Sequence, residues 1–324
     1  MLNYDILIVG AGPAGSSAAS EAAKYGAKVL LIEKKKIIGE PVQCAEFIPK
    51  PILSEVEISR DSIVQEIKGM RTHLPNGECV ESYLPGYMLN RSTFDKELAM
   101  KAVDSRVEVC INTLCSSKKK EKIFINKNGR EIDVTAKVII GADGPKSTVG
   151  KWINSVNRDF IIGMQYSVPL VSSLEFTEVY FDQDFFGGYG WLFPKGESAN
   201  VGVGIKYNSI TKTNKSLSSI LKKFVKVLEE DGKVKNSPFL TTSGLIPVGG
   251  PLNTVKDNIM LVGDAAGQTH PITGGIDYEK EWKDIFGKEL ERARTKRCFL
   301  ESNWDKLDRI VKKCWTVFRE YYYE

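Results

Sequence analysis

The sequence predicts an α/β fold, α+β over the whole chain, in which a Rossmann-like domain is interrupted by an antiparallel sheet and followed by helices. Three observations support this prediction. A strand, a glycine-rich turn, a helix and a second strand follow one another near the N-terminus. Buried strand runs return near residues 138 and 258, and residues 160–205 contain strands with little helix between them. We therefore expect the Rossmann-like domain to be discontinuous.

The N-terminal unit begins with an apolar run from Asp5 to Val9, which has no helical period and is typical of a strand buried on both faces. The small, Ala-rich segment from Pro13 to Tyr25 favours a helix, and Gly26 follows where a helix C-terminal glycine belongs. A second buried run, Lys28 to Ile32, predicts the next strand. This order and spacing are those of a dinucleotide-binding unit.

The glycines of this unit follow the pattern G-x-G-x-x-G, and each has a mechanical role. Gly10 allows the tight turn, Gly12 lets the backbone approach a pyrophosphate, and Gly15 allows the helix to pack closely on the strand. The helix N-terminus offers N–H groups and a positive dipole end to phosphates. Glu33, at the end of the second strand, can accept hydrogen bonds from a ribose diol. The unit alone does not distinguish NAD from FAD.

Composition excludes several classes of function. The 45 Lys+Arg and 41 Asp+Glu give a net charge of +4, too small to favour nucleic acid as a partner. No apolar segment is long enough to span a bilayer, and no signal peptide is recognisable, so we expect a cytoplasmic protein. The six cysteines form no C-x-x-C pair and there are two histidines, which argues against a zinc site, a disulfide framework or triad hydrolysis.

The middle of the chain is predicted to add hairpins, one helix and further strands. Turn signals at Pro75-Asn76-Gly77 and Asn128-Gly129 each separate two strand-like runs. The predicted elements are strands 69–74 and 78–84, a helix 92–103, strand 107–111, strands 122–126 and 131–134, and strand 138–141.

From residue 160 the pattern changes to a meander of antiparallel strands, followed by helices. The expected strands are 164–170, 177–181, 190–194 and 199–205; an amphipathic helix covers 217–228, and strands 240–247 and 258–262 follow. Two helices close the chain, one with Trp282, Ile285, Phe286 and Leu290, the other with Leu307, Ile310, Val311 and Trp315.

Two of these strands each deliver an aspartate beside glycine. The strand ending at Gly141 runs into Asp143-Gly144, and the strand from Asn258 runs into Gly263-Asp264. Ligands of open α/β sheets lie at the carboxyl ends of strands, so these aspartates can bind a ligand hydroxyl or orient loop groups. The alternative for each is an ordinary turn aspartate.

In this order and spacing, the glycine-rich turn and the two aspartate motifs resemble the FAD-dependent oxidoreductases of the p-hydroxybenzoate hydroxylase superfamily over nearly the whole chain. The resemblance implies FAD rather than NAD, with ADP at the first motif, Asp143 supporting the cofactor loop and Asp264 on the flavin ribityl chain. Arg91 heads an R-x-x-F-D-x-x-L segment and matches a family arginine that reaches the FAD. FAD contacts are also implied at Ala14 and Cys115.

A narrower resemblance is to the geranylgeranyl reductase family, especially the archaeal digeranylgeranylglycerophospholipid reductases. The segment GEPVQCAE, residues 39–46, is similar to the cysteine-bearing loop that lies beside the flavin in that family. It implies cofactor contacts at Cys44 and Ala45 and makes Cys44 the candidate catalytic residue. The alternative is a buried, inert thiol.

The second stretch is YGWLFP, residues 189–194, followed by Gly202-Val203-Gly204. It is similar to the Y-x-W-x-F-P…G-x-G substrate-cavity signature of the same family. Alternation along a strand places the three aromatic residues on one face, where they would form an apolar wall for an isoprenoid chain; the alternative is plain sheet core. The predicted substrate-binding residues are Tyr189, Trp191, Phe193, Pro194, Gly202 and Gly204.

One departure from the family follows the second aspartate motif. There the family runs through P-x-T-G-G-G-I into a long helix beside the cofactor, whereas here Pro271–Ile276 leads directly into residues 277–282, which resemble the family's following helix. One glycine and one whole helix are therefore absent. The resemblance implies FAD contacts at Gly274, Gly275 and Ile276.

The leading hypothesis is an FAD-dependent reductase that saturates C=C bonds of geranylgeranyl chains in membrane phospholipid precursors. Because there is no second G-x-G-x-x-G, we expect a transient electron donor, either NAD(P)H or a small redox protein. A lipid substrate suggests peripheral membrane contact, for which Trp304, Trp315 and Phe318 could serve, with ordinary helix packing as the alternative. The rival hypotheses are an FAD monooxygenase of an aromatic or polyene substrate, and a shortened member that has lost flavin binding and activity.

The expected domains follow from this assignment. The FAD-binding domain comprises 1–66, 89–157 and 257–277; the antiparallel-sheet substrate domain comprises 67–88 and 158–256; and a helical segment covers 278–324.

Overall fold

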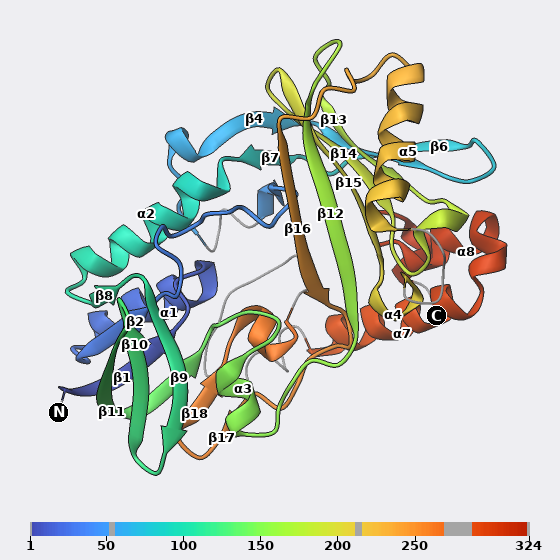
Figure 1. The fold of residues 1–324 in the computed structure, drawn as a ribbon. Helices are drawn as coiled ribbons and strands as arrows, with labels where there is room; N and C mark the ends of the chain where they lie inside the picture. The colour runs from blue at the N-terminus through green and yellow to red at the C-terminus, as the bar shows by residue number, and fades with distance from the viewer. Residues whose placement is uncertain (1, 52–55, 211–215, 269–286, 323–324) are drawn as a thin grey trace. The chain divides into compact units, whose positions relative to one another are not determined.

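The computed structural model describes residues 2–51, 56–210, 216–268 and 287–322 (Figure 1). The chain forms two compact units, each built from segments that are distant in the sequence. The first unit comprises Met1–Val42, Arg91–Arg158 and Pro247–Leu290, and the second comprises Gln43–Asn90, Asp159–Ile246 and Glu291–Glu324. Residues 43–66, assigned from sequence to the nucleotide domain, thus lie in the second unit.

The first unit is organised around a mainly parallel sheet in the order β17-β18-β11-β1-β2-β8. The strands are β1 (Leu2–Val9), β2 (Val29–Ile32), β8 (Glu108–Cys110), β11 (Arg130–Gly141), β17 (Val255–Lys256) and β18 (Ile259–Leu261). The second half of β1 and all of β2 are largely buried because both faces of the sheet are covered there. Their apolar runs therefore lack alternation.

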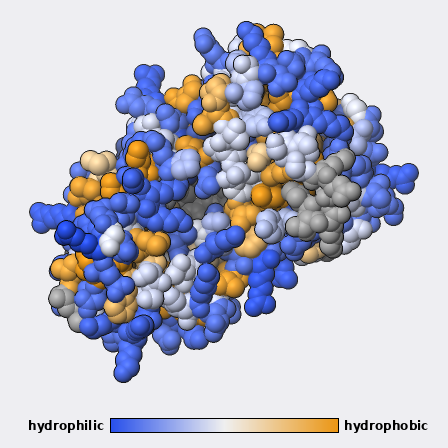
Figure 2. All heavy atoms as spheres, viewed as in Figure 1, coloured by the Kyte–Doolittle hydropathy of each residue, from blue (hydrophilic) through white to orange (hydrophobic). Residues whose placement is uncertain are grey.

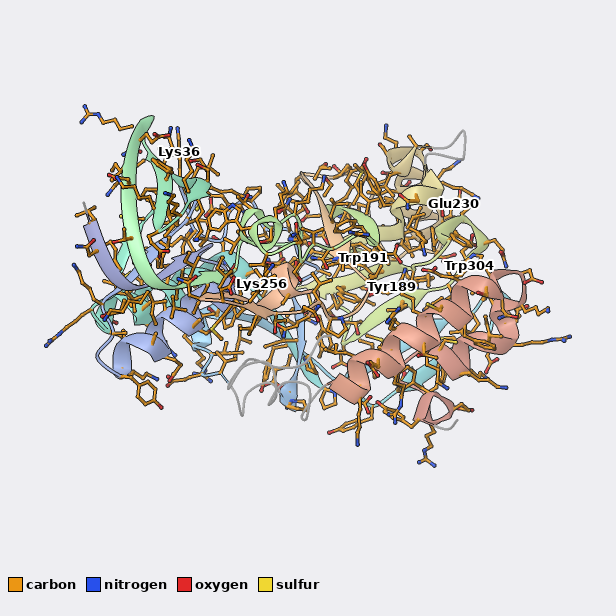
Figure 3. All side chains as sticks on the ribbon, turned by 90° about the horizontal axis from the view of Figure 1, so that it is seen from below. Lys36, Tyr189, Trp191, Glu230, Lys256 and Trp304 are labelled. Carbon is orange, nitrogen blue, oxygen red and sulfur yellow. The ribbon has the colours of Figure 1, made fainter. Side chains whose placement is uncertain are left out.

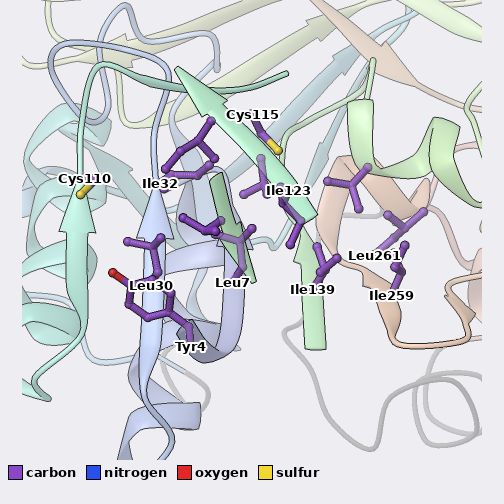
Figure 4. Packing of buried hydrophobic residues seen from close by; sticks show 14 of the residues in the cluster. Tyr4, Leu7, Leu30, Ile32, Cys110, Cys115, Ile123, Ile139, Ile259 and Leu261 are labelled. Carbon is purple, nitrogen blue, oxygen red and sulfur yellow. The ribbon is translucent and has the colours of Figure 1, made fainter. Parts of the chain in front are cut away.

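Different elements cover the two faces of this sheet. Helices α1 (Pro13–Lys24) and α2 (Arg91–Asp104) contribute Ala19 and Ala102 to a core cluster on one face. Strands β9 (Thr113–Lys119) and β10 (Lys122–Lys127), with helix α3 (Thr148–Trp152), build the cluster on the other face. Figure 4 shows Cys115 and Ile123 packed together with Ile32 and Leu7 in this cluster.

The structure corrects two predictions in this region. The runs at 131–134 and 138–141 are one strand, β11, which pairs antiparallel with β10 and parallel with β1. The polar residues Thr135 and Lys137 concealed that continuity, although Thr135 pairs with Asn3 of β1. Strand β9 was not predicted, because Ser116 to Lys119 give its second half a polar character.

The second unit contains a seven-stranded sheet in the order β16-β12-β15-β14-β13-β5-β6. Its strands are β5 (Gly69–His73), β6 (Cys79–Ser82), β12 (Phe160–Pro169), β13 (Phe176–Tyr180), β14 (Gly190–Lys195), β15 (Ser198–Lys206) and β16 (Leu240–Pro247). The predicted meander is wrong in part: β12 pairs with β15, and β13 pairs in parallel with β5. Strand periodicity identifies faces, whereas these partners are set by long-range packing.

Helix α5 (Leu217–Glu230) packs on one face of this sheet through Leu221, Phe224 and Leu228. The opposite face carries a small sheet of β3 (Phe47–Pro49), β4 (Ile63–Ile67) and β7 (Gly86–Leu89), together with α8 (Leu307–Cys314). The remaining described helices and turns are α4 (Tyr207–Ile210), α7 (Lys288–Ser302), η2 (Arg60–Ser62), η3 (Gln183–Phe185), η4 (Gly263–Ala266), η6 (Trp304–Lys306) and η7 (Arg319–Tyr322).

The closing aromatic residues pack inward. Trp304 and Phe318 are buried in the cluster that lies against the sheet, and Trp315 packs on that cluster. Of the first predicted closing helix, Trp282, Ile285 and Phe286 lie outside the described residues. No described helix has the length and apolarity needed to cross a bilayer, and on the face shown in Figure 2 apolar residues are interspersed with hydrophilic ones.

A buried carboxylate of the second unit, Glu178, links β13 to the neighbouring strand β5 and to Lys233. Glu178 of β13 is 2% exposed; its Oε2 lies 3.1 Å from His73 Nε2 and 2.5 Å from Lys233 Nζ, and it also accepts from the Tyr180 hydroxyl. Burial alone would raise the pKa of Glu178. The hydrogen bonds from His73, Lys233 and Tyr180 outweigh burial and lower that pKa from 4.5 to about 2.

This shift predicts an acid-dependent loss of stability. Because the folded-state pKa of Glu178 is depressed, its contribution to the free energy of unfolding is complete above pH 4.5 and disappears as the pH falls towards 2. We expect the advantage of the wild type over Glu178→Gln to decrease by about 3 kcal/mol over that interval. Urea unfolding of both proteins from neutral to acidic pH measures it.

The matched control is Glu81→Gln on β6, which removes an exposed ion pair with Arg71. That substitution is expected to change the free energy of unfolding by less than about 1 kcal/mol. Parallel pH profiles for the wild type and Glu178→Gln would contradict the account of Glu178.

Candidate functional site

The glycine-rich loop of the first unit adopts the geometry that its spacing predicts. Gly10 has φ +104, and a Cβ there would lie 2.3 Å from the Ala142 carbonyl oxygen. A Cβ on Gly15 would lie 1.9 Å from the Gly10 carbonyl oxygen, so α1 packs directly on the turn. A Cβ on Gly12, by contrast, would meet nothing within 4 Å. The loop is therefore crowded on its sheet side and open where α1 begins, as phosphate binding requires.

Glu33 follows β2 and holds this loop in place. Its Oε2 accepts a hydrogen bond from the Ala11 N–H at 2.9 Å, and its Oε1 accepts from the Lys35 N–H at 2.9 Å. The residue is 8% exposed. Each carboxylate oxygen can accept a second hydrogen bond. Glu33 thus serves the loop and retains capacity for a ribose hydroxyl.

The two aspartate motifs differ in what they do locally. Asp143 accepts hydrogen bonds from the Ser147 hydroxyl and from the Thr148 N–H at the start of α3, so it stabilises its own turn. Asp264 lies in η4 and is exposed to solvent, yet the surrounding protein raises its pKa by desolvation, while the charge of Arg91 opposes the rise. Asp264 is therefore the aspartate available to a ligand.

Two further predicted contacts lie close to these motifs. Ala14 Cβ lies 3.1 Å from the ideal Cβ position on Gly263, which places the start of α1 beside the second aspartate turn. Arg91 begins α2, and its Nε donates to Asp95 Oδ1 at 3.0 Å. These residues and the open α1 terminus provide the donors and acceptors that suit a dinucleotide.

Cys115 is a core residue. It is 4% exposed on β9, and burial, with a smaller effect of the Asp143 charge, raises its pKa to about 12. Its side chain packs within the hydrophobic cluster of the first unit. Gly274, Gly275 and Ile276 lie outside the described residues.

The loop that carries Cys44 is fastened to the second unit by polar contacts. Glu46, with φ +74 and 4% exposure, pairs with Lys195 Nζ at 2.7 Å and accepts from Asn200 Nδ2 at 2.8 Å. The Glu46 N–H points to Cys44 Sγ at 3.2 Å. The Cys44 thiol is half-buried, and Ala45 packs on the neighbouring hydrophobic cluster.

The aromatic strand β14 has the predicted alternation. Trp191 and Phe193 belong to the cluster beneath α8, whereas Leu192 belongs to the cluster beneath α5. A Cβ on Gly202 would lie 2.2 Å from Trp191 Cζ2, and one on Gly204 would lie 3.6 Å from Trp191 Cζ3. Gly202 therefore makes room for the indole, whereas a Cβ on Gly204 would only be in ordinary van der Waals contact with it.

Much of this aromatic face is covered by the chain itself. Trp191 and Phe193 are 8% and 7% exposed, and Pro194 is buried. Tyr189 precedes β14 and keeps a partly exposed side chain, while its ring lies 4.9 Å from that of Trp315. Figure 3 shows Tyr189 and Trp191 on the sheet near the helical segment. Of the three aromatic residues, Tyr189 is the one whose side chain keeps partial exposure to solvent.

Gln165, Asn200 and Lys195 were not predicted from sequence, although they connect the aromatic sheet to the Cys44 loop. Gln165 Nε2 donates to the Cys44 carbonyl oxygen at 3.0 Å. The available signal was a buried polar residue inside an apolar strand, such as Gln165 between Met164 and Tyr166. Within the described ranges, no group of three His, Cys, Asp or Glu side chains could hold a metal ion.

Two family models match separate ranges of the chain. The geranylgeranyl reductase catalytic domain matches residues 159–242, and the FAD dependent oxidoreductase family matches residues 5–144. The first range contains β12 to β15 and the start of β16. The second runs from within β1 to the end of β11 and Asp143, and it includes the glycine-rich loop and residues 43–90 of the second unit.

Similar proteins align over most of the chain. A digeranylgeranylglycerophospholipid reductase of Methanosarcina acetivorans is 36% identical, over 95% of this chain and 88% of the relative. Another, from Methanosphaera stadtmanae, is 38% identical, over 85% of this chain and 74% of the relative. The first alignment extends over 360 residues, more than the 324 residues of this chain, so that relative contains residues without a counterpart here.

Solved structures give the same relationship at the level of the fold. A geranylgeranyl bacteriochlorophyll reductase-like protein from Thermoplasma acidophilum is 30% identical with a TM-score of 0.82, covering 98% of this chain and 93% of that one. A probable FAD-dependent monooxygenase from Pseudomonas aeruginosa, 16% identical with a TM-score of 0.59 over 97% and 92% of the chains, shares the fold. The match to the FAD dependent oxidoreductase family supports a flavin cofactor.

The loop geometry predicts a small loss of stability for one alanine substitution and a larger loss for another. Gly12→Ala should change the free energy of unfolding by no more than about 1 kcal/mol, because the added Cβ enters open space at φ −72. Gly15→Ala should cost about 1–3 kcal/mol or more, because its Cβ would collide with the Gly10 carbonyl. Urea unfolding of the flavin-free proteins separates the two, and equal losses would contradict this geometry.

Proposed function

The chain belongs to the geranylgeranyl reductase family, and on that premise we propose that it is an FAD-dependent reductase of C=C bonds in the geranylgeranyl chains of membrane phospholipid precursors. The observation that carries the proposal is the aromatic strand β14, whose Trp191 indole lies over Gly202, inside the range that matches the catalytic-domain model. Relatives named as digeranylgeranylglycerophospholipid reductases support the substrate class.

The proposed cofactor is FAD, held at its ADP end by the first unit. The open start of α1 at Gly12 would bind the pyrophosphate, and Glu33 would accept from the adenosine ribose. Arg91 and Asp264 would contact the middle of the cofactor, since each presents a polar group near the carboxyl ends of the strands. Reduced FAD, when bound, supplies the hydride for alkene reduction.

The proposed substrate surface is built from β14 and β15. An isoprenoid chain offers only apolar contacts, which aromatic rings satisfy through large, rigid surfaces. Tyr189 is the accessible ring, Trp191 forms the buried wall behind it, and Gly202 lets that wall lie flat on the sheet. We assign to these residues the orientation of the chain and the exclusion of water from the reacting bond.

Cys44 is the proposed residue beside the reacting centre. An isolated alkene receives a hydride on one carbon and a proton on the other, so a protein group must be positioned close to the bond. The half-buried Cys44 thiol, held by the Glu46 backbone, is the candidate in the loop that resembles the family's cysteine-bearing segment.

The electron donor and the site of action follow from this proposal. A single G-x-G-x-x-G supports transient recharging by NAD(P)H or a small redox protein rather than a second nucleotide domain. A phospholipid substrate favours action at a membrane surface of the cytoplasm. The inward packing of Trp304 and Phe318 means that these residues are not the membrane contact.

The proposal is tested with the purified protein, excess FAD and dithionite under anaerobic conditions. We expect a geranylgeranyl phospholipid to gain the mass of two hydrogen atoms for each bond saturated, as measured by mass spectrometry. The matched control is Gly12→Ala, which should remain folded but lose flavin and activity, because its methyl group occupies the place proposed for phosphate.

Two outcomes would contradict the proposal, and each would favour one of the rival hypotheses. Substrate-dependent oxygen consumption without saturation would favour the monooxygenase hypothesis. A colourless protein that FAD cannot reconstitute would favour a member that has lost its flavin, a hypothesis motivated by the residues that the Methanosarcina acetivorans relative has and this chain lacks.

A further inference from the structure

A single buried side chain joins the aromatic strand to the Cys44 loop. Gln165 of β12 is 6% exposed, and both ends of its amide are used. Its Oε1 accepts from the Trp191 indole N–H at 3.2 Å, and its Nε2 donates to the Cys44 carbonyl oxygen at 3.0 Å. The partners are 26 and 121 residues away in the sequence, so the bridge is entirely tertiary.

The chemistry of the two partners fixes the orientation of this amide. An indole N–H can only donate, and a backbone carbonyl can only accept. Turning the Gln165 amide over would place its NH₂ against the Trp191 N–H and its oxygen against the Cys44 carbonyl. Both contacts would then be lost inside the protein, where an unpaired polar group is costly. The bridge therefore has one stable arrangement.

Apart from the Glu46 N–H that points to the Cys44 thiol, the following contacts of the loop hold the neighbours of Cys44. Glu46 is fixed by Lys195 and Asn200, and Gln43 donates through its exposed side chain to the Ser243 carbonyl at 2.7 Å. In the sequence, Cys44 lies between Gln43 and Glu46, and its backbone carbonyl is held by the hydrogen bond from Gln165. Because Trp191 also lies against Gly202, the same bond links Cys44 to a ring that cannot shift independently.

We propose that Gln165 is a positioning residue, which holds the Cys44 backbone in fixed register with the Trp191 wall. Its effect on turnover rests on the proposed function, whereas its effect on the Cys44 loop does not. Loss of the bridge should release the loop and displace the thiol from the place where the substrate wall presents the alkene. Misplacement of this kind lowers the rate of the chemical step more than substrate binding.

The test compares Gln165→Leu with Gln65→Leu. Gln65 is a matched control, because it also bridges two backbone groups in the second unit: its Nε2 donates to the Leu174 carbonyl and its Oε1 accepts from the Gly196 N–H at 2.9 Å. Alkylation of the Cys44 peptide by iodoacetamide, followed by mass spectrometry, reports loop release without any activity. We expect a several-fold faster rate in Gln165→Leu and an unchanged rate in Gln65→Leu.

Turnover provides the second readout. For a geranylgeranyl phospholipid, kcat of Gln165→Leu should fall by about tenfold or more with little change in KM. Gln65→Leu should retain both constants even where its loss of thermal stability is comparable.

Gln165→Glu makes the alkylation rate of Cys44 depend on pH only if the hydrogen bond to the Cys44 carbonyl positions the loop. A neutral carboxyl group can donate to the Cys44 carbonyl and accept from Trp191, whereas a carboxylate can only accept. Its alkylation rate, divided by that of the wild type at each pH, should be close to one in acid and should rise towards the Gln165→Leu value as the introduced acid ionises. This variant keeps the test valid if Gln165→Leu fails to fold.

The outcomes separate the two proposals. An alkylation rate at Cys44 that is the same in wild type, Gln165→Leu and Gln65→Leu, with a flat Gln165→Glu ratio, overturns the positioning role even if the protein reduces lipid. Faster alkylation in Gln165→Leu, in a protein without reductase activity, supports the bridge and instead counts against the proposed function.

Discussion

The backbone contact between Gly15 and Gly10 is the constraint on which the cofactor half of the molecule depends. Because no side chain intervenes, α1 packs directly on the turn after β1, and the space where a Gly12 Cβ would lie is open. The Ala11 N–H bond to Glu33 ties the same turn to β2, so the positions proposed for phosphate and ribose would be set together. The ability of this turn to bind a dinucleotide therefore depends on the geometry of its backbone.

In the second unit a glycine has a different role. Gly202 lets the Trp191 indole lie on the sheet, where its N–H reaches Gln165. The remainder of the aromatic face is covered by α8 and its flanking residues, which makes most of the signature structural core. Core and substrate surface are thus not exclusive alternatives here, because a rigid apolar wall must itself be packed from behind.

Local signals made the first unit largely predictable. Helix α1, strand β2 and the end of β1 were placed within one residue, because Pro13, Gly26 and the apolar runs mark these ends, whereas β1 begins three residues before the predicted Asp5. The pairing of β12 with β15 was not predictable in this way, since alternation specifies a face and not a partner. Gln165 escaped prediction for a similar reason: a single amide in an apolar strand belongs to no motif.

The central claim is that a flavin held by the first unit passes its electrons to a prenyl chain. The most direct measurement is a single turnover without oxygen, in which the flavin-loaded protein is reduced by one equivalent of dithionite and mixed with a geranylgeranyl phospholipid. The account predicts that oxidised-flavin absorbance returns as the lipid gains two hydrogen atoms, in equal amounts. A flavin that stays reduced until oxygen is admitted would contradict it.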